Sequence, residues 1–278
     1  MSSEPHKRSR VVIALEATLE DDFALEIARD LVASASPELL GVFVENVRLL
    51  DYARSRLARE IMLTGRERPL DARQLERQIR AQSARVKARF EAVASKLGLP
   101  HMFQVTRGEL IAELVERAAE AEALVLSIAR QSGTAARPVD PAIRRLFEAP
   151  PRAVLFLRDG WRGGGSVLAL IDSADLSDPA LEAAARLAKQ SGSPLTVVLS
   201  GAALAQREQT LRLLHGHLRS LGVDLEDVVA LRHASAQGLA QAARICRARL
   251  VVMPAGDTDL ILELLGRLSS ALLLVRRE

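Results

Sequence analysis

The sequence has few aromatic residues, a single cysteine and no long apolar run, and each shortage excludes a class of function. Aromatic residues make up 3% of the 278 residues, so stacking platforms for single-stranded nucleic acid are scarce. The single cysteine, Cys246, excludes a disulfide framework and a Cys-rich metal site. No apolar run approaches the ~20 residues of a membrane-spanning helix or the roughly 7–15 of a secretory signal. We therefore expect a cytoplasmic protein with no membrane partner.

What is present is typical of a soluble globular chain with room for two domains. Hydrophobic residues make up 49% and charged residues 26% of the chain. The net charge is only +3, but it is unevenly distributed. Between Arg48 and Lys96, 13 Lys and Arg residues face 6 Asp and Glu residues, which gives a local net charge of +7. This basic segment is a candidate surface for an acidic protein or for nucleic acid, although a solvated helix face is the simpler interpretation.

The chain contains an internal repeat. Residues 12–16 match residues 168–172 at an offset of 156, and the same offset pairs residues 39–43 with residues 195–199. Short runs of Val, Ile and Leu alternate with segments of helical spacing, as is typical of parallel sheets covered by helices on both faces. We expect strands near 10–15, 39–44, 101–106, 123–128 and 153–157 in the first half, and near 166–171, 195–199, 227–232, 249–253 and 271–275 in the second.

These patterns predict an α/β protein built from two tandem doubly wound, Rossmann-like halves, each with a parallel five-stranded sheet. The first domain spans residues 1–159 and the second spans residues 166–278, with a glycine-rich connection between them. A helical insert at residues 46–100 enlarges the first domain. Within it we expect a helical stretch from Leu49 to Met62 and a long helix after the turn at residues 69–71.

Several of these residues resemble the universal stress protein family. The first strand of each half ends in an acidic residue, Glu16 or Asp172, and the last apolar strand of each half ends in Arg158 or Arg276. The resemblance covers both halves and implies a flavodoxin-like strand order of 3-2-1-4-5. It also implies pairing through the fifth strands, here residues 154–157 with residues 272–275, so that one chain mimics the dimer of single-domain members.

The resemblance further implies an ATP-binding loop after the fourth strand. The family motif reads Gly, two residues, Gly, nine residues, Gly, then Ser or Thr, and its glycines let backbone N–H groups approach phosphates. The second half keeps part of it. The residues that correspond to the adenosine and phosphate contacts are Asp172, Ser173, Met253, Gly256, Gly266, Arg267 and Ser269.

The second half nevertheless departs from the motif. Met253 stands where the first glycine belongs, and Arg267 replaces the Ser or Thr. Asp257 and Asp259 add negative charge that repels phosphate, which Arg267 and Ser269 offset in part. The first half departs further, because Glu16-Ala17 replaces Asp-Ser and its loop lacks the glycines.

No arrangement of catalytic or metal-binding residues is apparent. His215 and His217 are two residues apart, so they point in different directions on a helix. His233 and Cys246 have ordinary structural interpretations, Cys246 as a buried inert thiol on an apolar helix face. We therefore expect no enzyme activity and no metal.

The expected function is that of a non-catalytic stress-response or regulatory module without a cofactor, which acts through protein partners or as a homo-oligomer such as a dimer. The alternative is an adenine-nucleotide switch in which only the second domain binds ATP. A third reading, an enzyme acting on an adenine nucleotide, lacks the serine-glycine-glycine phosphate loop of nucleotide-activating relatives of this fold.

Overall fold

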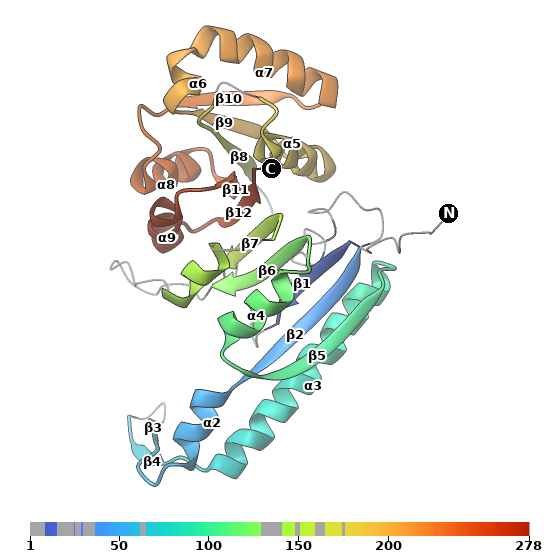
Figure 1. The fold of residues 1–278 in the computed structure, drawn as a ribbon, viewed down its shortest axis with the longest axis vertical. Coiled ribbons are helices and arrows are strands. Elements are labelled where there is room, and N and C mark those ends of the chain that lie inside the picture. The colour runs from blue at the N-terminus through green and yellow to red at the C-terminus, as the bar shows by residue number, and fades with distance from the viewer. Residues whose placement is uncertain are drawn as a thin grey trace.

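The structure is a computed structural model that describes residues 9–15, 25, 29, 37–61, 65–128, 141–147, 151–158, 165–173 and 176–277. Ten of its strands form one sheet in the order β10-β9-β8-β11-β12-β7-β6-β1-β2-β5 (Figure 1). The first half contributes β1 (Arg10–Ala14), β2 (Glu38–Asn46), β5 (His101–Gly108), β6 (Ala123–Ile128) and β7 (Ala153–Arg158). The second contributes β8 (Ser166–Ile171), β9 (Leu195–Leu199), β10 (Leu225–Ala230), β11 (Ala248–Ala255) and β12 (Ala271–Arg276).

Within each half of this sheet all neighbouring strands are parallel, and their order is 3-2-1-4-5 as predicted. The two sheets are not separate, however. β7 and β12 pair antiparallel, with Leu155 opposite Leu273 and Val154 opposite Leu274, so the expected pairing of the fifth strands is confirmed. The two predicted five-stranded sheets are thereby one continuous ten-stranded sheet.

Helices cover both faces of this sheet. Buried side chains of α3 (Ala72–Lys96), α5 (Pro179–Ser191) and α7 (Arg207–Leu221) belong to the apolar cluster on one face. Those of α4 (Leu110–Ala118), the 3₁₀ helix η1 (Pro141–Phe147), α8 (Ala236–Ile245) and α9 (Thr258–Arg267) belong to the cluster on the other. The short α6 (Gly201–Ala205) precedes α7. Among the described residues, no helix is both long and apolar enough to cross a membrane.

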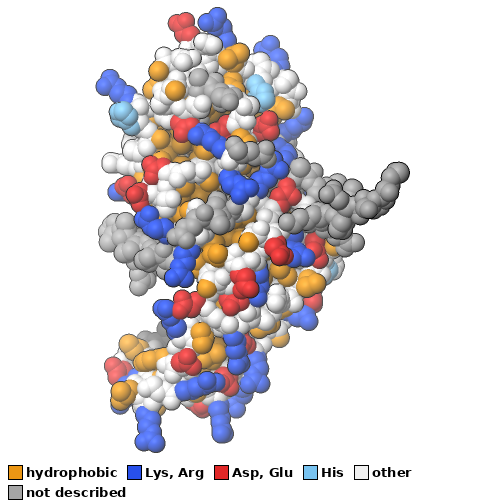
Figure 2. Space-filling view, in the orientation of Figure 1, with side chains coloured by type: hydrophobic (Ala, Val, Ile, Leu, Met, Phe, Trp, Pro, Cys, Tyr) orange, Lys and Arg blue, Asp and Glu red, His pale blue; other side chains and the backbone are white. Residues whose placement is uncertain are grey.

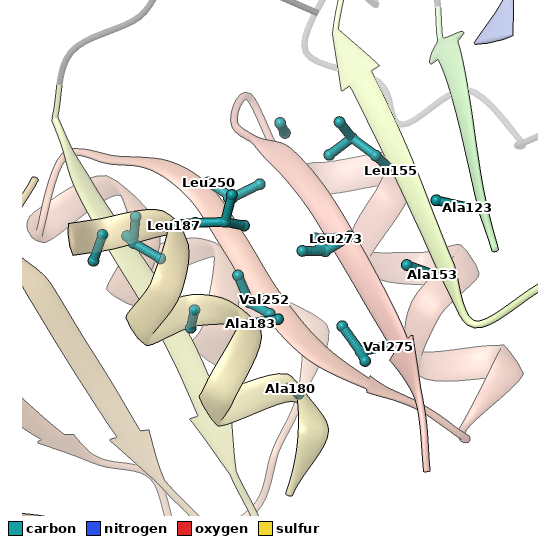
Figure 3. Close-up of a cluster of buried hydrophobic side chains, with 14 of the residues drawn as sticks. Ala123, Ala153, Leu155, Ala180, Ala183, Leu187, Leu250, Val252, Leu273 and Val275 are labelled. Carbon is teal, nitrogen blue, oxygen red and sulfur yellow. The ribbon is translucent and has the colours of Figure 1, made fainter. Parts of the chain in front are cut away.

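The apolar core runs without interruption across the junction of the halves. Figure 3 shows Leu155 of β7 beside Leu273 of β12, which in turn pairs with Val252 of β11. All three side chains are almost fully buried. Truncating one large buried residue to alanine costs a protein about 2–5 kcal/mol of stability. Because this layer contains residues of both halves, it couples the stability of the two halves.

The insert at residues 46–100 contains more than helices. After α2 (Val47–Arg54) comes a hairpin of β3 (Arg59–Ile61) and β4 (Glu67–Pro69), so the predicted helical stretch from Leu49 is wrong beyond Arg54. Ser55 ends the helix in an extended conformation, and its hydroxyl accepts a hydrogen bond from the Leu57 N–H (3.2 Å). Met62, where the predicted stretch ends, lies outside the described residues.

The long helix α3 forms as predicted, and its N-cap is Asp71, whose carboxylate accepts bonds from the N–H groups of Arg73 and Gln74. Its C-terminal half packs over β2 and β5, where Phe90 is 2% exposed and lies edge-on to His101. Its N-terminal half extends beyond the sheet together with α2 and the hairpin (Figure 1). We call this projection, residues 47–80, the arm.

At the β5 edge of the sheet, a partly buried polar contact ties β5 to α4. Thr106 Oγ1 donates to Glu113 Oε2 (2.7 Å), and Arg117 Nη1 donates to the same oxygen (2.8 Å). The Thr106 hydroxyl lowers the pKa of Glu113 below its ordinary value of 4.5; burial opposes this shift, and the bond and charge of Arg117 reinforce it. The carboxylate therefore stabilises the fold only while it is ionised.

Glu113→Gln should reveal this contact through the pH dependence of stability. Because the folded-state pKa of Glu113 is lowered, its contribution is complete above the unfolded value near 4.5 and is lost as the pH falls through the lower folded value. We expect the variant to unfold at lower urea concentration than the parent at pH 7, with the gap closing below pH 4.5. A gap that is constant from pH 7 to the acid limit would contradict this assignment.

The backbone just before β8 requires a glycine at position 165. Its φ is +108°, and a Cβ at this position would lie 2.2 Å from the Arg247 carbonyl oxygen, which is backbone and does not move easily. We expect Gly165→Ala to cost at least about 2 kcal/mol in the free energy of urea unfolding. The matched control is Gly256→Ala, where a Cβ meets nothing within 4 Å, and it should stay within about 0.5 kcal/mol of the parent.

Candidate functional site

The candidate site lies at the carboxyl ends of the second-half strands. The chain leaves β8 toward β9 on one side and leaves β11 toward β12 on the other, so the strand order reverses between β8 and β11. Ligands of open α/β sheets bind outside the carboxyl ends of the strands at such a switch point. Asp172 and Ser173 follow β8 directly, and Gly256 follows β11.

Asp172 is held through its backbone and its side chain. Its carbonyl oxygen accepts bonds from the N–H groups of Ala202 (3.1 Å) and Ala203 (3.4 Å) in the first turn of α6. This approach needs a glycine at position 201, where φ is +52° and a Cβ would lie 3.0 Å from the same oxygen. The turn between β9 and α6 thus fixes the backbone of Asp172 at the switch point.

The Asp172 carboxylate already has a cationic partner. Arg277, the residue after β12, donates from Nη2 to Asp172 Oδ1. The same guanidinium binds Asp178 Oδ2 through Nε (2.9 Å) and Nη2 (2.7 Å). Because β11 lies between β12 and β8 in the sheet, Arg277 reaches past the end of β11 to the far side of the switch point. We call these three residues the Arg277 latch.

The latch is built into the local structure. Asp178 is the N-cap of α5, where its other carboxylate oxygen accepts the Ala180 N–H (2.9 Å), and its side chain is only 5% exposed. Partial burial disfavours the charge on Arg277, but the hydrogen bonds to Asp172 and Asp178 outweigh it and raise the pKa of the guanidinium. A charge-assisted network of this kind is stronger than a single exposed ion pair.

The N-terminus of α9, where the family motif would hold phosphates, is also occupied by an acid. Only Gly256 and Asp257 separate β11 from α9, and Asp257 Oδ1 accepts the Leu260 N–H (3.0 Å). In the first turn of the helix, Asp259 binds Arg144 of η1 (2.8 Å). Two carboxylates at a helix N-terminus satisfy its positive dipole and oppose a second anion.

The structure does not bring the seven predicted contact residues together. Asp172, Ser173 and Gly256 lie at the carboxyl edge of the sheet, whereas Met253 is inside β11 and 2% exposed. Gly266, Arg267 and Ser269 lie at the other end of α9, about 15 Å along its axis, where the chain enters the amino end of β12. Arg267 there binds Glu263 (2.9 Å). Nucleotide binding by this set stays a prediction.

Two features of this region were not predicted from the sequence. The first is Arg277, for which the only signal is a pair of arginines after the last apolar strand. The second is the pairing of Arg144 with Asp259, which joins the two halves on the α9 face of the sheet. In the first half, Glu16, Ala17 and the loop at residues 129–140 lie outside the described residues.

Two of the remaining candidates, His215 and Cys246, show ordinary structural surroundings. His215 contacts the Leu211 carbonyl of its own helix through Nδ1 (2.7 Å). Burial raises the pKa of the Cys246 thiol, which disfavours the nucleophilic thiolate. Within the part of the chain that the structure describes, no three His, Cys, Asp or Glu side chains are grouped to hold a metal ion.

The architecture of two doubly wound halves in one sheet has counterparts among solved structures, although sequence comparison alone finds none. The sequence matches no protein-family profile, and it matches none of the curated proteins. Solved structures do match. A universal stress protein from Archaeoglobus fulgidus DSM 4304 superposes with a TM-score of 0.63 at 12% identity, covering 96% of this chain and 98% of that one.

Two further structures match over nearly the whole chain. A functionally unknown protein from Pseudomonas aeruginosa PAO1 has a TM-score of 0.59 at 14% identity, with 97% and 92% of the two chains covered. The cytoplasmic domain of a prokaryotic cation chloride cotransporter has a TM-score of 0.52 at 12% identity, with 96% and 95% covered. Identities this low show the fold alone. The chain has the fold of a tandem universal stress protein, which confirms the resemblance at the level of architecture.

Removing the latch arginine should destabilise the protein measurably. Arg277→Ala leaves the buried Asp178 carboxylate without its cation, and we expect a loss of about 1–2 kcal/mol in the free energy of urea unfolding. Arg277→Lys cannot bind both acids with a planar fork, so its free energy of unfolding should lie between those of the parent and Arg277→Ala. Arg219→Ala at the exposed end of α7 is the control and should change stability by less than about 0.5 kcal/mol. An Arg277→Ala protein as stable as the parent would refute the latch.

Proposed function

We propose that this chain is a non-catalytic regulatory module of the universal stress protein type that acts through protein partners. The observation that carries the proposal is the Arg277 latch. The family resemblance assigns Asp172 to the adenosine, but here its carboxylate binds an arginine of the same chain. A ligand at the switch point must first displace this pairing, and so it loses the contribution of the charge-assisted bonds that it breaks.

The N-terminus of α9 supports the same conclusion. In a nucleotide-binding loop, free backbone N–H groups at a helix N-terminus receive the phosphates. Here Asp257 already accepts one of these N–H groups, and its charge repels a phosphate at close range. Gly256 provides one glycine at this place, and the next glycine of the motif lies at the far end of the helix.

The internal β7–β12 pairing supports a role for partners other than a second copy at this edge. The resemblance implies that single-domain relatives dimerise through their fifth strands, and this chain makes that contact within itself. The β7 and β12 edges are therefore unavailable to other chains. A homodimer, if it forms, must use another surface.

The alternative function is an adenine-nucleotide switch in the second half, and one observation favours it. Asp172 and Ser173 stand at the carboxyl end of β8 next to the switch point, in the order that the resemblance requires. In this alternative the latch is a gate, since nucleotide binding and the Arg277–Asp172 pairing compete for one carboxylate.

Calorimetric titration with Mg-ATP, after a check for co-purified nucleotide, separates the two functions. We expect no saturable binding to the parent protein up to about 1 mM ATP, because Asp172 is paired and the α9 terminus is capped. Arg277→Ala is the variant in which the Asp172 carboxylate is unpaired, and Asp172→Ala is the variant that lacks this carboxylate. Saturable binding of one nucleotide per parent chain that is lost in Asp172→Ala would establish the nucleotide switch and refute the proposal.

A further inference from the structure

The arm carries a group of arginines without acidic partners. Among the described residues, five exposed arginines of the arm make no ion pair or side-chain hydrogen bond: Arg56, Arg59, Arg66, Arg73 and Arg77. Other cations of the arm are paired, as Arg68 is with Glu60 and Arg54 with Glu76. The arm therefore concentrates exposed, unpaired positive charge in one short segment.

The same projection exposes apolar side chains. Of eight large hydrophobic residues that are exposed in the described chain, four lie on the arm: Leu49 (43%), Tyr52 (50%), Leu57 (83%) and Ile61 (74%). Figure 2 shows hydrophobic side chains among the Lys and Arg side chains at the lower end of the molecule, which is the arm in Figure 1. Clustered exposed hydrophobics, unlike single ones, mark interaction surfaces.

The arm is also rigid enough to present this surface. Leu50 and Ala53 of α2 are buried, and α2 packs against α3 and β5. Tyr52 Oη accepts the Arg59 N–H (3.3 Å), which ties the helix to the hairpin. Across the hairpin, Glu60 lies opposite Arg68. α3 runs from the arm back over β2 and β5 without a break, so the arm is anchored on the sheet.

We propose that the arm is the docking surface for an acidic, amphipathic segment of a partner protein. Carboxylates of the partner pair with the five free arginines, whose planar forks bind carboxylate bidentately. Apolar side chains of the partner cover Leu57, Ile61 and their neighbours. This inference rests on the proposed function, because it names the surface through which a partner-dependent module acts.

Charge excludes a second copy as the preferred occupant. Residues 47–80 contain nine Lys or Arg residues and five Asp or Glu residues, so two arms brought face to face would repel one another. Nucleic acid matches the charge but not the apolar side chains, and Tyr52 is the only aromatic residue on the arm.

An anionic membrane fits less well than a protein. The exposed carboxylates of Asp51 and Glu67 lie on the arm together with the apolar side chains, and Glu67 stands opposite Ile61 in the hairpin. A uniformly anionic lipid surface repels these acids at the place where Ile61 would insert. A protein partner can place a basic group against each acid and a carboxylate against each arginine.

The test uses the full-length protein and a fluorescein-labelled synthetic helix with Glu on its polar face and Leu on its apolar face. Fluorescence anisotropy should show saturable binding, and replacing every Glu of the peptide by Gln should weaken it at least about tenfold. Arg73→Glu/Arg77→Glu should weaken binding of the parent peptide to a similar extent. Leu57→Ser/Ile61→Ser should weaken it without changing the net charge of the protein.

The matched control is Arg212→Glu/Arg219→Glu on α7, which makes the same change in net charge on an exposed helix far from the arm and should keep binding within about twofold. Urea unfolding of each variant confirms that it is folded. Parallel titrations use phosphatidylserine vesicles and duplex and single-stranded oligonucleotides, and light scattering reports self-association.

The proposal is overturned if the peptide does not bind, if the α7 control loses as much affinity as the arm variant, or if vesicles or oligonucleotides bind the arm more tightly. A dimer that dissociates on Arg73→Glu/Arg77→Glu would also overturn it in favour of a second copy. Saturable Mg-ATP binding with intact peptide binding would instead refute the proposed function and leave the docking surface standing.

Discussion

The antiparallel pairing of β7 with β12 is the contact on which the rest of the structure depends. Each fifth strand is apolar on both faces, and left at the edge of a five-stranded sheet it would invite pairing with other chains. Joining the two strands buries both and leaves β5 and β10 as the edges of the sheet. These edges carry charge, with Arg107 of β5 bound to Glu45 (2.6 Å) and Glu226 and Asp227 exposed on β10, which discourages further pairing.

The same pairing determines what happens at the ligand-binding end of the second half. Because β12 is inside the sheet, its carboxyl end emerges beside β11 and within reach of β8. The residue after β12 is Arg277, whose guanidinium binds Asp172 and Asp178. A fold whose resemblance implies a ligand at this place instead satisfies its acids internally. The arm, which lies away from the latch, carries five exposed arginines that form no ion pair among the described residues.

Much of the fold follows from the sequence, because local patterns determine it. The ten strands of the main sheet are short apolar runs between turn residues, and caps such as Asp71 and Asp178 begin helices where the sequence indicates them. The hairpin in the arm was missed because β3 and β4 have three residues each and no apolar alternation, so the helical spacing after Leu49 seemed to continue.

The candidate site was less predictable for a physical reason. The position of Asp172 at the end of a strand is local and was found, whereas its partner is 105 residues away in the sequence and is set by the sheet order. The motif spacing groups Gly256 with Gly266, but the fold places the two glycines at opposite ends of α9. The residues between the two glycines form α9, which runs from the carboxyl ends of the strands toward their amino ends. Two residues at the spacing of the family motif therefore need not contact the same ligand.

Amide hydrogen exchange of the intact chain, with and without Mg-ATP and with and without the acidic helix peptide, tests the central claim most directly. We expect Mg-ATP to leave protection unchanged at the carboxyl ends of β8, β9 and β11. The peptide should increase protection in α2, the hairpin and the start of α3. Increased protection around Asp172 and Gly256 with Mg-ATP, together with an arm that the peptide leaves unchanged, would contradict this claim.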